Sequence, residues 1–417
     1  MAVYQRAALA ATLVLAAGAA VGQQTTQTTA TPVATPAAAK PPPDPCAPSQ
    51  YAGDKYAPTP AFPGQTGAPA LAPSKGYVVQ TIASGLVRPR SIVFLGDGSA
   101  LVSEGGSRLR VLSKSGSLSA PIAGTPEALP ESAYEIVLDR GFSKNRTLYL
   151  AFRAPKPGEV VPEGRRAVGI GRVFRARLAL SGDHLEDSKL IHEGGYLRRM
   201  LQLPDGTLLL TTTGAVGDIA QRLGEVDGKV LRINADGSIP KDNPFVGKAG
   251  ARPELYSIGH RDPDGITRDP ATGRIWLSEH GPRGGDEINV IKAGANYGFP
   301  VITYGRDYSG EQIDGGLTAK AGMEQPVYYW TPDIAPSGMA VYRGAMFPRW
   351  TGDLFVTALV GKKLVRLAMK GGKVSGEEAI LSGRCERYRD VRQAPDGSLY
   401  VLTDQDPGAV LRISRAP

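Results

Sequence analysis

The sequence predicts an all-β fold built of radial sheet blades, and two observations support this prediction. The first is a recurring unit in which a short apolar strand leads through an Asp-Gly or similar turn into a second β-rich strand. Asp-Gly between alternating apolar residues is a strong local signal for a β-hairpin. The second is that no amphipathic helix of convincing length separates these units. Hairpins that recur every several tens of residues are typical of β-propellers, in which only short, protected strand edges remain.

Six copies of this hairpin unit can be recognised along the chain. Four have clear turns, at Asp97-Gly98, Asp205-Gly206, Thr272-Gly273 and Asp396-Gly397. A fifth copy, at 347–356, has the turn Gly352-Asp353, and a weaker sixth copy, at 137–150, has Lys144-Asn145. The spacing is too irregular to give the number of blades by itself. A chain of 417 residues suffices for one large β domain or two ordinary ones.

The N-terminal 75 residues differ in composition from the rest. Residues 1–22 have the features of a secretory signal peptide: a positive charge at Arg6, an apolar run at 7–17 and small residues at 20–22. That run is too short for a transmembrane segment, so we expect export, to a periplasm or beyond. Residues 23–75 are rich in Thr, Pro and Ala, and we expect a disordered leader there. Residues 76–417 would then form the β domain.

The chain has a formal charge of +8. No basic run alternates with aromatic residues, so the charge does not indicate a nucleic-acid-binding groove. We interpret it as a site that favours an acidic ligand, or as a well-solvated surface. The two cysteines, Cys46 and Cys385, allow one disulfide in an exported protein. A ring-shaped fold would bring them together, whereas a disordered leader need not reach Cys385.

The densest cluster of glycine and charged residues lies between Gly259 and Gly305. It contains GHRDPDG at 259–265, EHGPRGGDEIN at 279–289 and NYGFP at 296–300. Glycine allows the backbone to approach a ligand closely or to adopt positive φ angles. The interleaved Arg, His, Asp and Glu residues therefore predict a charged, oxygen-rich ligand. Two glycine-rich turns between strands would give the same pattern without a ligand.

These motifs resemble the signature of the soluble sugar dehydrogenases that use pyrroloquinoline quinone (PQQ), the glucose/sorbosone dehydrogenase family. That signature reads GHRNPQG, then EHGPxGGDEIN, then NYGWP. The likeness runs from about Gly85 to the end, through GKVLR at 228–232, DNPF at 242–245, PSGM at 336–339 and RYRDV at 387–391. The resemblance implies a six-bladed β-propeller, which agrees with the six hairpin units, and a site carried by loops at one end of the channel.

The resemblance also implies how the quinone would be held. Arg387 and Arg389 alternate along an expected strand and so face the same side, where two guanidinium groups suit carboxylates. In the family, this pair contacts the quinone carboxylates, of which there are three. Arg261, Asp262 and His280 are further cofactor contacts by resemblance. On the residues alone, the two arginines could lie on a solvated surface strand, and His280 could bond a loop carbonyl.

Calcium is the metal that the resemblance implies. It takes six to eight oxygen ligands, commonly carboxylates and backbone carbonyls. The carbonyls of Gly281 and Pro282 would hold one calcium that also binds the quinone. Glu287 and Tyr297 would hold a second, structural calcium. On the residues alone, Glu287 could be a salt-bridged loop carboxylate.

The position of the catalytic base departs from the family. The family uses a histidine in an HxGGRL motif before a strand that ends in Pro-Asp-Gly, and this histidine takes the proton of the anomeric hydroxyl. Here the segment 192–206 reads HEGGYLRRMLQLPDG. Counting back from Pro204 without a gap places Gly195 at the position of the base. His192 precedes it by three residues, and an odd shift turns a strand residue to the opposite face. His192 would reach the site only through a three-residue insertion; otherwise it is a surface or core histidine.

Other positions depart from the family as well. Its site glutamine aligns with Pro130, which has no side-chain hydrogen bond to offer, and a cofactor-binding lysine aligns with Val360. The family asparagine after Arg261 is Asp262, whose charge disfavours an anionic cofactor unless calcium or Arg261 offsets it. Trp330 stands where the family has an aromatic wall near the substrate, although a core position is equally compatible.

We therefore expect an exported enzyme that oxidises the anomeric carbon of a sugar to a lactone. PQQ and calcium would be its cofactors, with Arg261 and calcium polarising the quinone and His192 as the candidate base. The electrons would pass to an external acceptor. Two alternatives remain open, because fold alone does not fix function. One is a catalytically impaired propeller that binds a carbohydrate or carboxylate ligand, and the other is a calcium-dependent lactonase.

Overall fold

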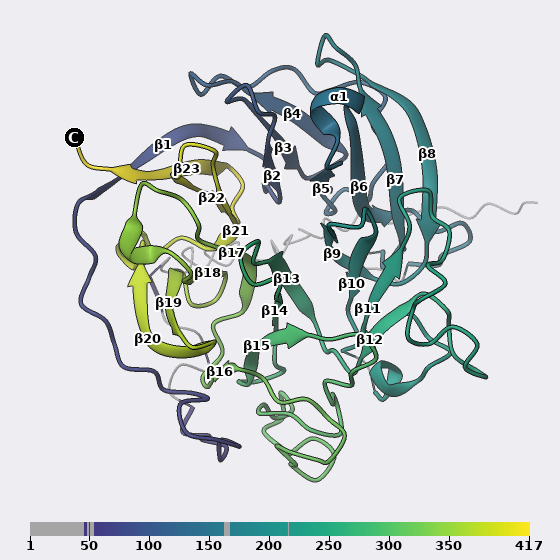
Figure 1. The fold of residues 1–417 in the computed structure, drawn as a ribbon, viewed down its shortest axis with the longest axis vertical. Coiled ribbons are helices and arrows are strands. Elements are labelled where there is room, and N and C mark those ends of the chain that lie inside the picture. The colour runs from purple at the N-terminus through teal and green to yellow at the C-terminus, as the bar shows by residue number, and fades with distance from the viewer. Residues whose placement is uncertain (1–45, 48–49, 51–53, 162–166, 216) are drawn as a thin grey trace, which may run out of the picture. The chain divides into compact units, whose positions relative to one another are not determined.

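The computed structural model describes residues 46–47, 50, 54–161, 167–215 and 217–417. The expected signal peptide (1–22) and the leader up to residue 45 lie outside the described residues. Within the unit 44–417, six antiparallel sheets surround a central channel (Figure 1). The prediction of an all-β, six-bladed β-propeller is confirmed. No helix in the described ranges is both long enough and apolar enough to cross a membrane.

Each blade starts with a strand beside the channel and ends with a strand at the periphery, except blade 6, which the two ends of the domain share. Blade 1 contains β2 (Ile92–Phe94), β3 (Ala100–Glu104) and β4 (Arg108–Leu112). Blade 2 contains β5 (Glu135–Leu138), β6 (Thr147–Ala154), β7 (Ile170–Leu178) and β8 (Leu185–Glu193). Blade 3 contains β9 (Leu197–Gln202), β10 (Leu208–Thr212), β11 (Lys229–Ile233) and β12 (Leu255–Ile258). Blade 4 contains β13 (Pro263–Arg268), β14 (Ile275–Glu279), β15 (Asp286–Ile291) and β16 (Tyr328–Trp330). Blade 5 contains β17 (Pro336–Val341), β18 (Leu354–Ala358), β19 (Leu364–Lys370) and β20 (Lys373–Ile380). Blade 6 contains β21 (Tyr388–Gln393), β22 (Leu399–Thr403), β23 (Gly408–Arg415) and β1 (Tyr77–Leu86). The short helical turns are α1 (Phe142–Asn145), η1 (Ile219–Gln221), η2 (Pro348–Trp350) and η3 (Ser382–Arg384).

Blade 6 closes the ring, because it combines strands from both ends of the domain. Strand β1 pairs antiparallel with β23, with Tyr77 opposite Arg415 and Leu86 opposite Gly408. The first and last strands thus satisfy each other's backbone groups along their shared side, and β1 becomes the outer strand of blade 6.

The six hairpin units found in the sequence are the innermost hairpins of the six blades. The turn at Asp97-Gly98 joins β2 to β3, and corresponding turns join β5–β6, β9–β10, β13–β14, β17–β18 and β21–β22. In three of these turns an aspartate accepts bonds from the backbone N–H and the hydroxyl two residues later, as Asp97 does from Ser99 at 2.8 and 2.5 Å. Such local bonds fix the turn conformation.

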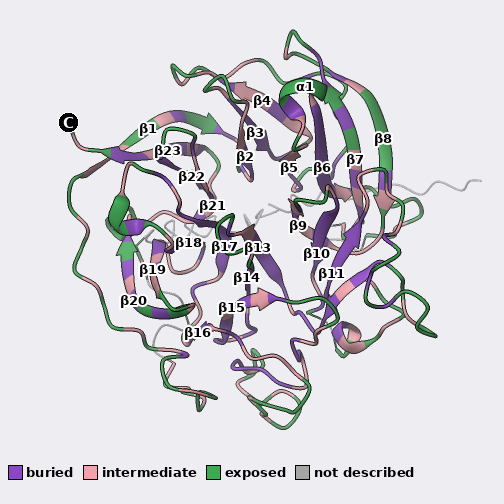
Figure 2. Ribbon diagram, viewed as in Figure 1, coloured by how far each residue is buried: buried purple, intermediate pink, exposed green. Residues whose placement is uncertain are grey.

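The hydrophobic core is divided among the interfaces between neighbouring blades. Each described cluster of buried apolar residues joins two adjacent blades, for example Leu101 of blade 1 with Ile136 of blade 2. Figure 2 shows buried residues along the strands near the channel and exposed residues on the peripheral strands and loops. Because alternate residues of a strand face opposite sides of its sheet, each blade packs against both neighbours. This packing holds the inner strands, and the polar residues on them, around one channel.

The segment 54–75, expected within the disordered leader, lies along blades 4 and 5. Its Asp54 pairs with Arg283 at 2.8 Å, and Gln65 is fully buried, where it donates to the Pro326 carbonyl at 2.9 Å. Leu71 N–H donates to the Glu377 carbonyl at 2.8 Å. Apolar residues do not recur at a regular spacing within this segment. It is ordered by hydrogen bonds and ion pairs with residues far away in the sequence, which composition does not reveal.

Cys46 and Cys385 form a disulfide with a Cα–Cα distance of 4.9 Å. Cys385 follows η3 and precedes β21, the inner strand of blade 6. The expected disulfide is therefore present. This bond links Cys46, the first described residue, to a position two residues before Arg387. It lies at the end of the channel that carries the candidate site.

Candidate functional site

Arg199 on β9 is a fully buried hub in the channel. Its guanidinium group donates to Glu135 of β5 at 2.8 Å and to the Asp264 carbonyl of β13 at 2.8 Å. It also reaches Ser337 of β17 at 3.1 Å and the Arg389 carbonyl of β21 at 2.8 Å. One side chain of blade 3 thus binds the inner strands of four other blades. A planar group with five N–H donors is suited to this role.

A second set of charges surrounds Asp264, whose side chain is 1 % exposed. Its carboxylate pairs with Arg389 at 2.8 Å and with Arg90 at 3.3 Å. Arg389 also pairs with Asp404 at 2.8 Å, and Asp404 receives the guanidinium group of Arg387 at 3.0 Å. Arg387, just before β21, and Arg389, on β21, therefore bind the same carboxylate.

A cavity of about 270 Å³ opens beside these charges. It is lined by the ends and loops of blades 1, 2, 3 and 6, and its wall contains five arginines and two carboxylates. The arginines are Arg88, Arg90, Arg153, Arg198 and Arg389, and the carboxylates are Glu131 and Asp404. Tyr196 lies between two of the cations, with the Arg153 and Arg198 guanidinium carbons 4.5 and 4.9 Å from its ring centre. Ligand pockets usually start at roughly 300 Å³, so the cavity has the size of a small-molecule site.

The electrostatics of this cavity favour an anion. Burial lowers the pKa of Arg90 to about 10, and the neighbouring charges of Arg199 and Arg389 act in the same direction against the effect of Asp264. Conversely, these arginines hold the pKa of Asp264 far below its usual range although burial opposes its ionisation. Burial and the neighbouring cations thus disfavour the charge of Arg90, and an anionic ligand beside it would offset both effects.

The negative charge of Asp262 is offset by Arg198, which the sequence did not predict as a site residue. Arg198 binds its two oxygens at 2.8 Å each, whereas the expected partners were calcium or Arg261. Burial opposes ionisation of Asp262, but Arg198 and His280 keep the pKa of Asp262 below its ordinary value. His280 places Nδ1 3.5 Å from Asp262, and its Nε2 lies 2.8 Å from the Pro336 carbonyl, to which it donates. The negative charge that Asp262 introduces in place of the family asparagine is therefore neutralised by neighbouring residues of the protein itself.

Arg261 contacts the main chain where the quinone-binding calcium was expected. Its Nη1 donates to the carbonyl of Gly281 at 2.8 Å and to that of His280 at 3.0 Å. Pro282 is buried against Gly305. A calcium ion on the Gly281 carbonyl would compete with a guanidinium group already bonded to it, so Arg261 would have to move. Arg261 is thus in direct contact with the Gly281 carbonyl, one of the two predicted ligands of this calcium ion.

A small enclosed space beside Gly281 has a donor set that suits a cation. It is lined by Glu279, Glu287 and Tyr297, among others. Burial and the neighbouring Glu279 raise the pKa of Glu287 well above its ordinary value. Asn289 bridges the two carboxylates through its Nδ2, at 2.8 and 3.0 Å, while its buried Oδ1 has no hydrogen-bond partner. Two close carboxylates and an orphaned amide oxygen fit a hard divalent cation. The Tyr297 hydroxyl bonds to Val290 and Lys292, so only its main-chain carbonyl is available as a ligand.

The expected single pocket is divided in this structure. Arg389 lines the arginine-rich cavity and Arg261 lines the small one, while Arg387 lines neither. Arg198, Asp262 and His280 connect the two walls through the contacts given above. A ligand that contacted both Arg389 and Arg261 would have to displace some of these three linking side chains.

His192 and Trp330 lie away from both cavities. His192 is on β8, the outer strand of blade 2, where burial lowers its pKa and its Nε2 has no hydrogen-bond partner. Trp330 is buried on β16 in the core between blades 4 and 5, and its indole N–H donates to Glu377 at 2.9 Å. Neither residue is among those that line the arginine-rich cavity.

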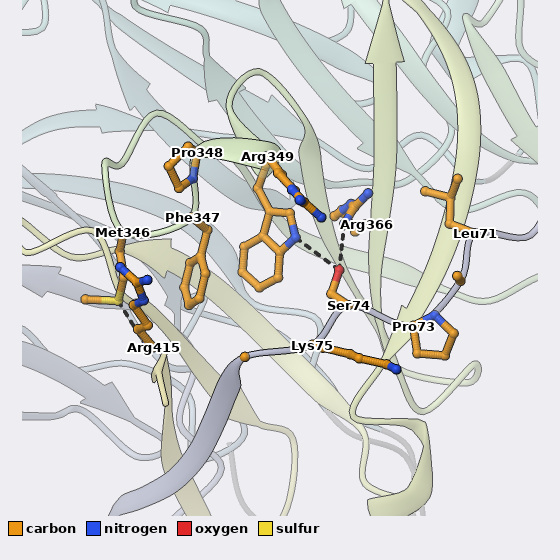
Figure 3. Close-up of a pocket in the computed structure, with 13 residues that line it drawn as sticks. Leu71, Pro73, Ser74, Lys75, Met346, Phe347, Pro348, Arg349, Arg366 and Arg415 are labelled. Atoms are coloured by element: carbon orange, nitrogen blue, oxygen red, sulfur yellow. Dashed lines mark hydrogen bonds between the residues drawn. The ribbon is translucent and has the colours of Figure 1, made fainter. Parts of the chain in front are cut away.

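A larger hollow, of about 720 Å³, lies where segment 71–76 passes the turn 346–350 (Figure 3). Its wall is mainly apolar, and its cations Lys75, Arg349 and Arg415 are exposed. The hydroxyl of Ser74 accepts both the Trp350 indole N–H at 3.2 Å and Arg366 at 2.8 Å. The segment itself thus satisfies the inner polar groups, which leaves the smaller, arginine-lined cavity as the candidate site.

Four arginines and two carboxylates of the candidate site were not predicted from the sequence: Arg88, Arg90, Arg153, Arg198, Glu131 and Asp404. A signal for Arg198 existed, because a buried aspartate in place of asparagine at 262 requires a cation nearby. Counting back from Pro204 places Arg198 on the second glycine of the HxGGRL motif and Arg199 on its arginine. Arg90 and Glu131 belong to loops of blades 1 and 2, and no local pattern marks them.

The fold and site define a β-propeller that gathers arginines around a cavity at one end of its channel. Comparison with known proteins gives the family. Residues 86–412 match the model of the Glucose / Sorbosone dehydrogenase family, and the chain belongs to this family.

Relatives and solved structures agree with this assignment. The chain is 38 % identical over 350 residues to the aldose sugar dehydrogenase YliI of Escherichia coli (strain K12), covering 79 % of this chain and 90 % of that protein. A crystal structure of a glucose dehydrogenase superposes with a TM-score of 0.75 at 38 % identity, over 80 % of this chain and 99 % of the other. The PQQ-bound aldose sugar dehydrogenase of Streptomyces coelicolor gives a TM-score of 0.63 at 25 % identity, over 82 % and 99 %.

Proposed function

We propose that the protein is a quinone-dependent sugar dehydrogenase that oxidises the anomeric carbon of an aldose to a lactone. The observation that carries the proposal is the arginine-lined cavity at the end of the channel, in which burial, together with the charges of Arg199 and Arg389, lowers the pKa of Arg90 to about 10. PQQ carries three carboxylates, and planar guanidinium groups bind carboxylates with two parallel hydrogen bonds. The family and its PQQ-bound member from Streptomyces coelicolor support the choice of cofactor.

In this proposal the chain's own residues hold the cofactor. Arg389, Arg90 and Arg198 line the cavity and would bind its carboxylates, while Arg387 keeps Asp404 in place from outside. The bound quinone supplies a two-electron acceptor for the hydrogen on the anomeric carbon. The buried aspartates 262 and 264 fix the guanidinium groups in position before the ligand arrives, which reduces the entropy lost on binding.

Calcium is part of the same proposal. The small cavity with Glu279, Glu287 and Asn289 would hold a structural ion, with the main-chain carbonyl of Tyr297 as a further ligand. A second ion on the Gly281 and Pro282 carbonyls would require Arg261 to leave the Gly281 carbonyl. The freed guanidinium group could then contact the quinone, as the family resemblance implies for Arg261.

Reconstitution tests the proposal. The purified protein with calcium and PQQ should reduce a redox dye when aldoses are added, and Arg389→Met should lower PQQ affinity about 10- to 100-fold, the effect of losing one charge-assisted pair. Arg412→Met, in an exposed pair with Asp396 on the same blade, serves as the matched control.

The possible outcomes separate the candidate functions. PQQ binding without turnover would identify a binding propeller, and hydrolysis of lactones without PQQ would identify a lactonase. Either result would refute the dehydrogenase assignment.

We propose further that the protein is exported and passes its electrons to a separate acceptor. The support is the sequence of residues 1–22 together with the disulfide, which persists in oxidising compartments. Analysis of the mature N-terminus in a cell fractionation would test export.

A further inference from the structure

The oxidation of a hemiacetal requires a group that accepts the hydroxyl proton. The chain has four histidines, and none lines the arginine-rich cavity. His184 is bonded to Asp183 and Glu186 on the exposed face of blade 2, and His260 is fully buried between Ser257 and Glu279. The placements of His192 and His280 are given above. The base must therefore come from another residue type.

Two carboxylates line the cavity, and one of them is fully occupied. Asp404 accepts two bonds from Arg389 on Oδ1, at 2.8 and 2.9 Å, and a bond from Arg387 on Oδ2 at 3.0 Å. Both oxygens of Asp404 are held by guanidinium groups, so a sugar hydroxyl could bond to Asp404 only by competing with these charge-assisted pairs.

Glu131 is different. Its Oε1 is buried and accepts no hydrogen bond from any described residue. Its ion-pair partner is Arg153, whose Nη2 lies 4.0 Å away, too far for a hydrogen bond. A buried carboxylate oxygen without a donor is costly to maintain, and in a ligand cavity it indicates a donor on the ligand. A sugar hydroxyl is such a donor.

The loop that carries Glu131 is held firmly against the cavity. Ser132 N–H donates to the Leu129 carbonyl at 2.8 Å, and Arg153 N–H donates to the Ser132 hydroxyl at 3.1 Å. Arg153 is fixed in turn by a bond to the Val168 carbonyl at 3.0 Å and by its stacking on Tyr196. These contacts hold the backbone of the loop and Arg153 in place, and none of them uses Oε1 of Glu131.

We propose that Glu131 is the general base of the sugar oxidation. This inference rests on the proposed function. The anomeric O–H bond breaks and its proton passes to the Glu131 carboxylate. The C–H bond of the same carbon breaks and its hydrogen and electron pair pass to the ortho-quinone cofactor, so that a C=O bond forms and the lactone leaves. Arg153 is a positioning residue that directs the carboxylate into the cavity.

The test compares Glu131→Gln with Glu127→Gln, an exposed residue of the same loop outside the cavity. Glu131→Gln should lower kcat about 10²- to 10⁴-fold, the usual contribution of a general base. Its PQQ affinity, measured by optical titration, and its melting temperature should match those of the wild type. In Glu131→Ala, added formate should restore turnover in part, because a small carboxylate can occupy the space left by the side chain. Glu127→Gln should behave as the wild type.

Each outcome has a distinct meaning. A Glu131→Gln variant that keeps the wild-type rate within about threefold refutes the assignment of the base and leaves the dehydrogenase function standing. A parallel loss of PQQ affinity and rate, without rescue by formate, also refutes it, because Glu131 would then be a binding residue. If the wild-type protein binds PQQ and oxidises no aldose, the proposed function fails, and the role of Glu131 fails with it.

Discussion

Arg199→Met should destabilise the propeller strongly, because Arg199 joins β9 to the inner strands of four other blades. The substitution removes the partner of Glu135 at 2.8 Å and of Asp390 at 3.5 Å from a fully buried position. Breaking one buried ion pair costs about 3–5 kcal/mol, because the remaining charge is left without a counter-ion.

The cost should stay in this range although every carboxylate keeps a second partner, because the carbonyls of Asp264 and Arg389 also lose their donor. Arg392 still pairs with Glu135 and with Asp390 at 2.9 Å each, and Arg389 still pairs with Asp264 at 2.8 Å. For a domain of this size, 1 kcal/mol corresponds to roughly 1.4 °C in Tm, so we expect a decrease of about 4–7 °C. The double variant with Arg392→Met should lose more than the sum of the single losses, because Glu135 and Asp390 then have no cation left.

Calorimetry and urea unfolding measure this effect. Arg412→Met is the matched control: its pair with Asp396 is exposed at 29 and 48 %, and such pairs contribute about 0–1 kcal/mol. If Arg199→Met changes the free energy of unfolding by less than about 1 kcal/mol, the ion network does not hold the inner strands together, and the argument fails.

Three further predictions concern other parts of the molecule. Reduction of the Cys46–Cys385 disulfide, or a Cys46→Ser variant, should lower the free energy of unfolding by about 2–4 kcal/mol. The loss is measured as a decrease in Tm. Dithiothreitol should not lower the Tm of the variant further. Although burial opposes it, bonds from Arg343 lower the pKa of Asp269 to about 2, against 3.8 in the unfolded chain. This pair therefore contributes up to about 2 kcal/mol above pH 4 that is lost as the pH falls towards 2, and Asp269→Asn should flatten that part of the stability–pH curve. Calcium at 100 times its Kd should raise the stability of the wild type by about 2.7 kcal/mol and leave Glu287→Gln nearly unchanged; an equal rise in both would exclude the small cavity as its site.

The sequence by itself determined the fold class, and its six hairpin units agreed with the six blades that the family resemblance implied. Each blade contains one hairpin whose turn is fixed by an aspartate or a glycine, such as Asp97-Gly98, and these local signals do not depend on the rest of the chain. The family motifs likewise lie within short stretches. The pairing of Cys46 with Cys385 was also within reach, because a closed ring brings distant parts of the chain together.

The tertiary structure alone decided which charges meet. Arg198 compensates Asp262 across 64 positions of sequence, and Arg90 meets Asp264 across 174, so no local pattern reports these pairs. Glu131 gains its free oxygen from the geometry of a loop on blade 2 rather than from a motif. The spacing of apolar residues and the residues of a turn determine structure over a few positions. The balance of charges at the end of the channel depends instead on side chains that come from several blades. For this reason the sequence specified the propeller, and only the folded chain showed which residues face the cavity.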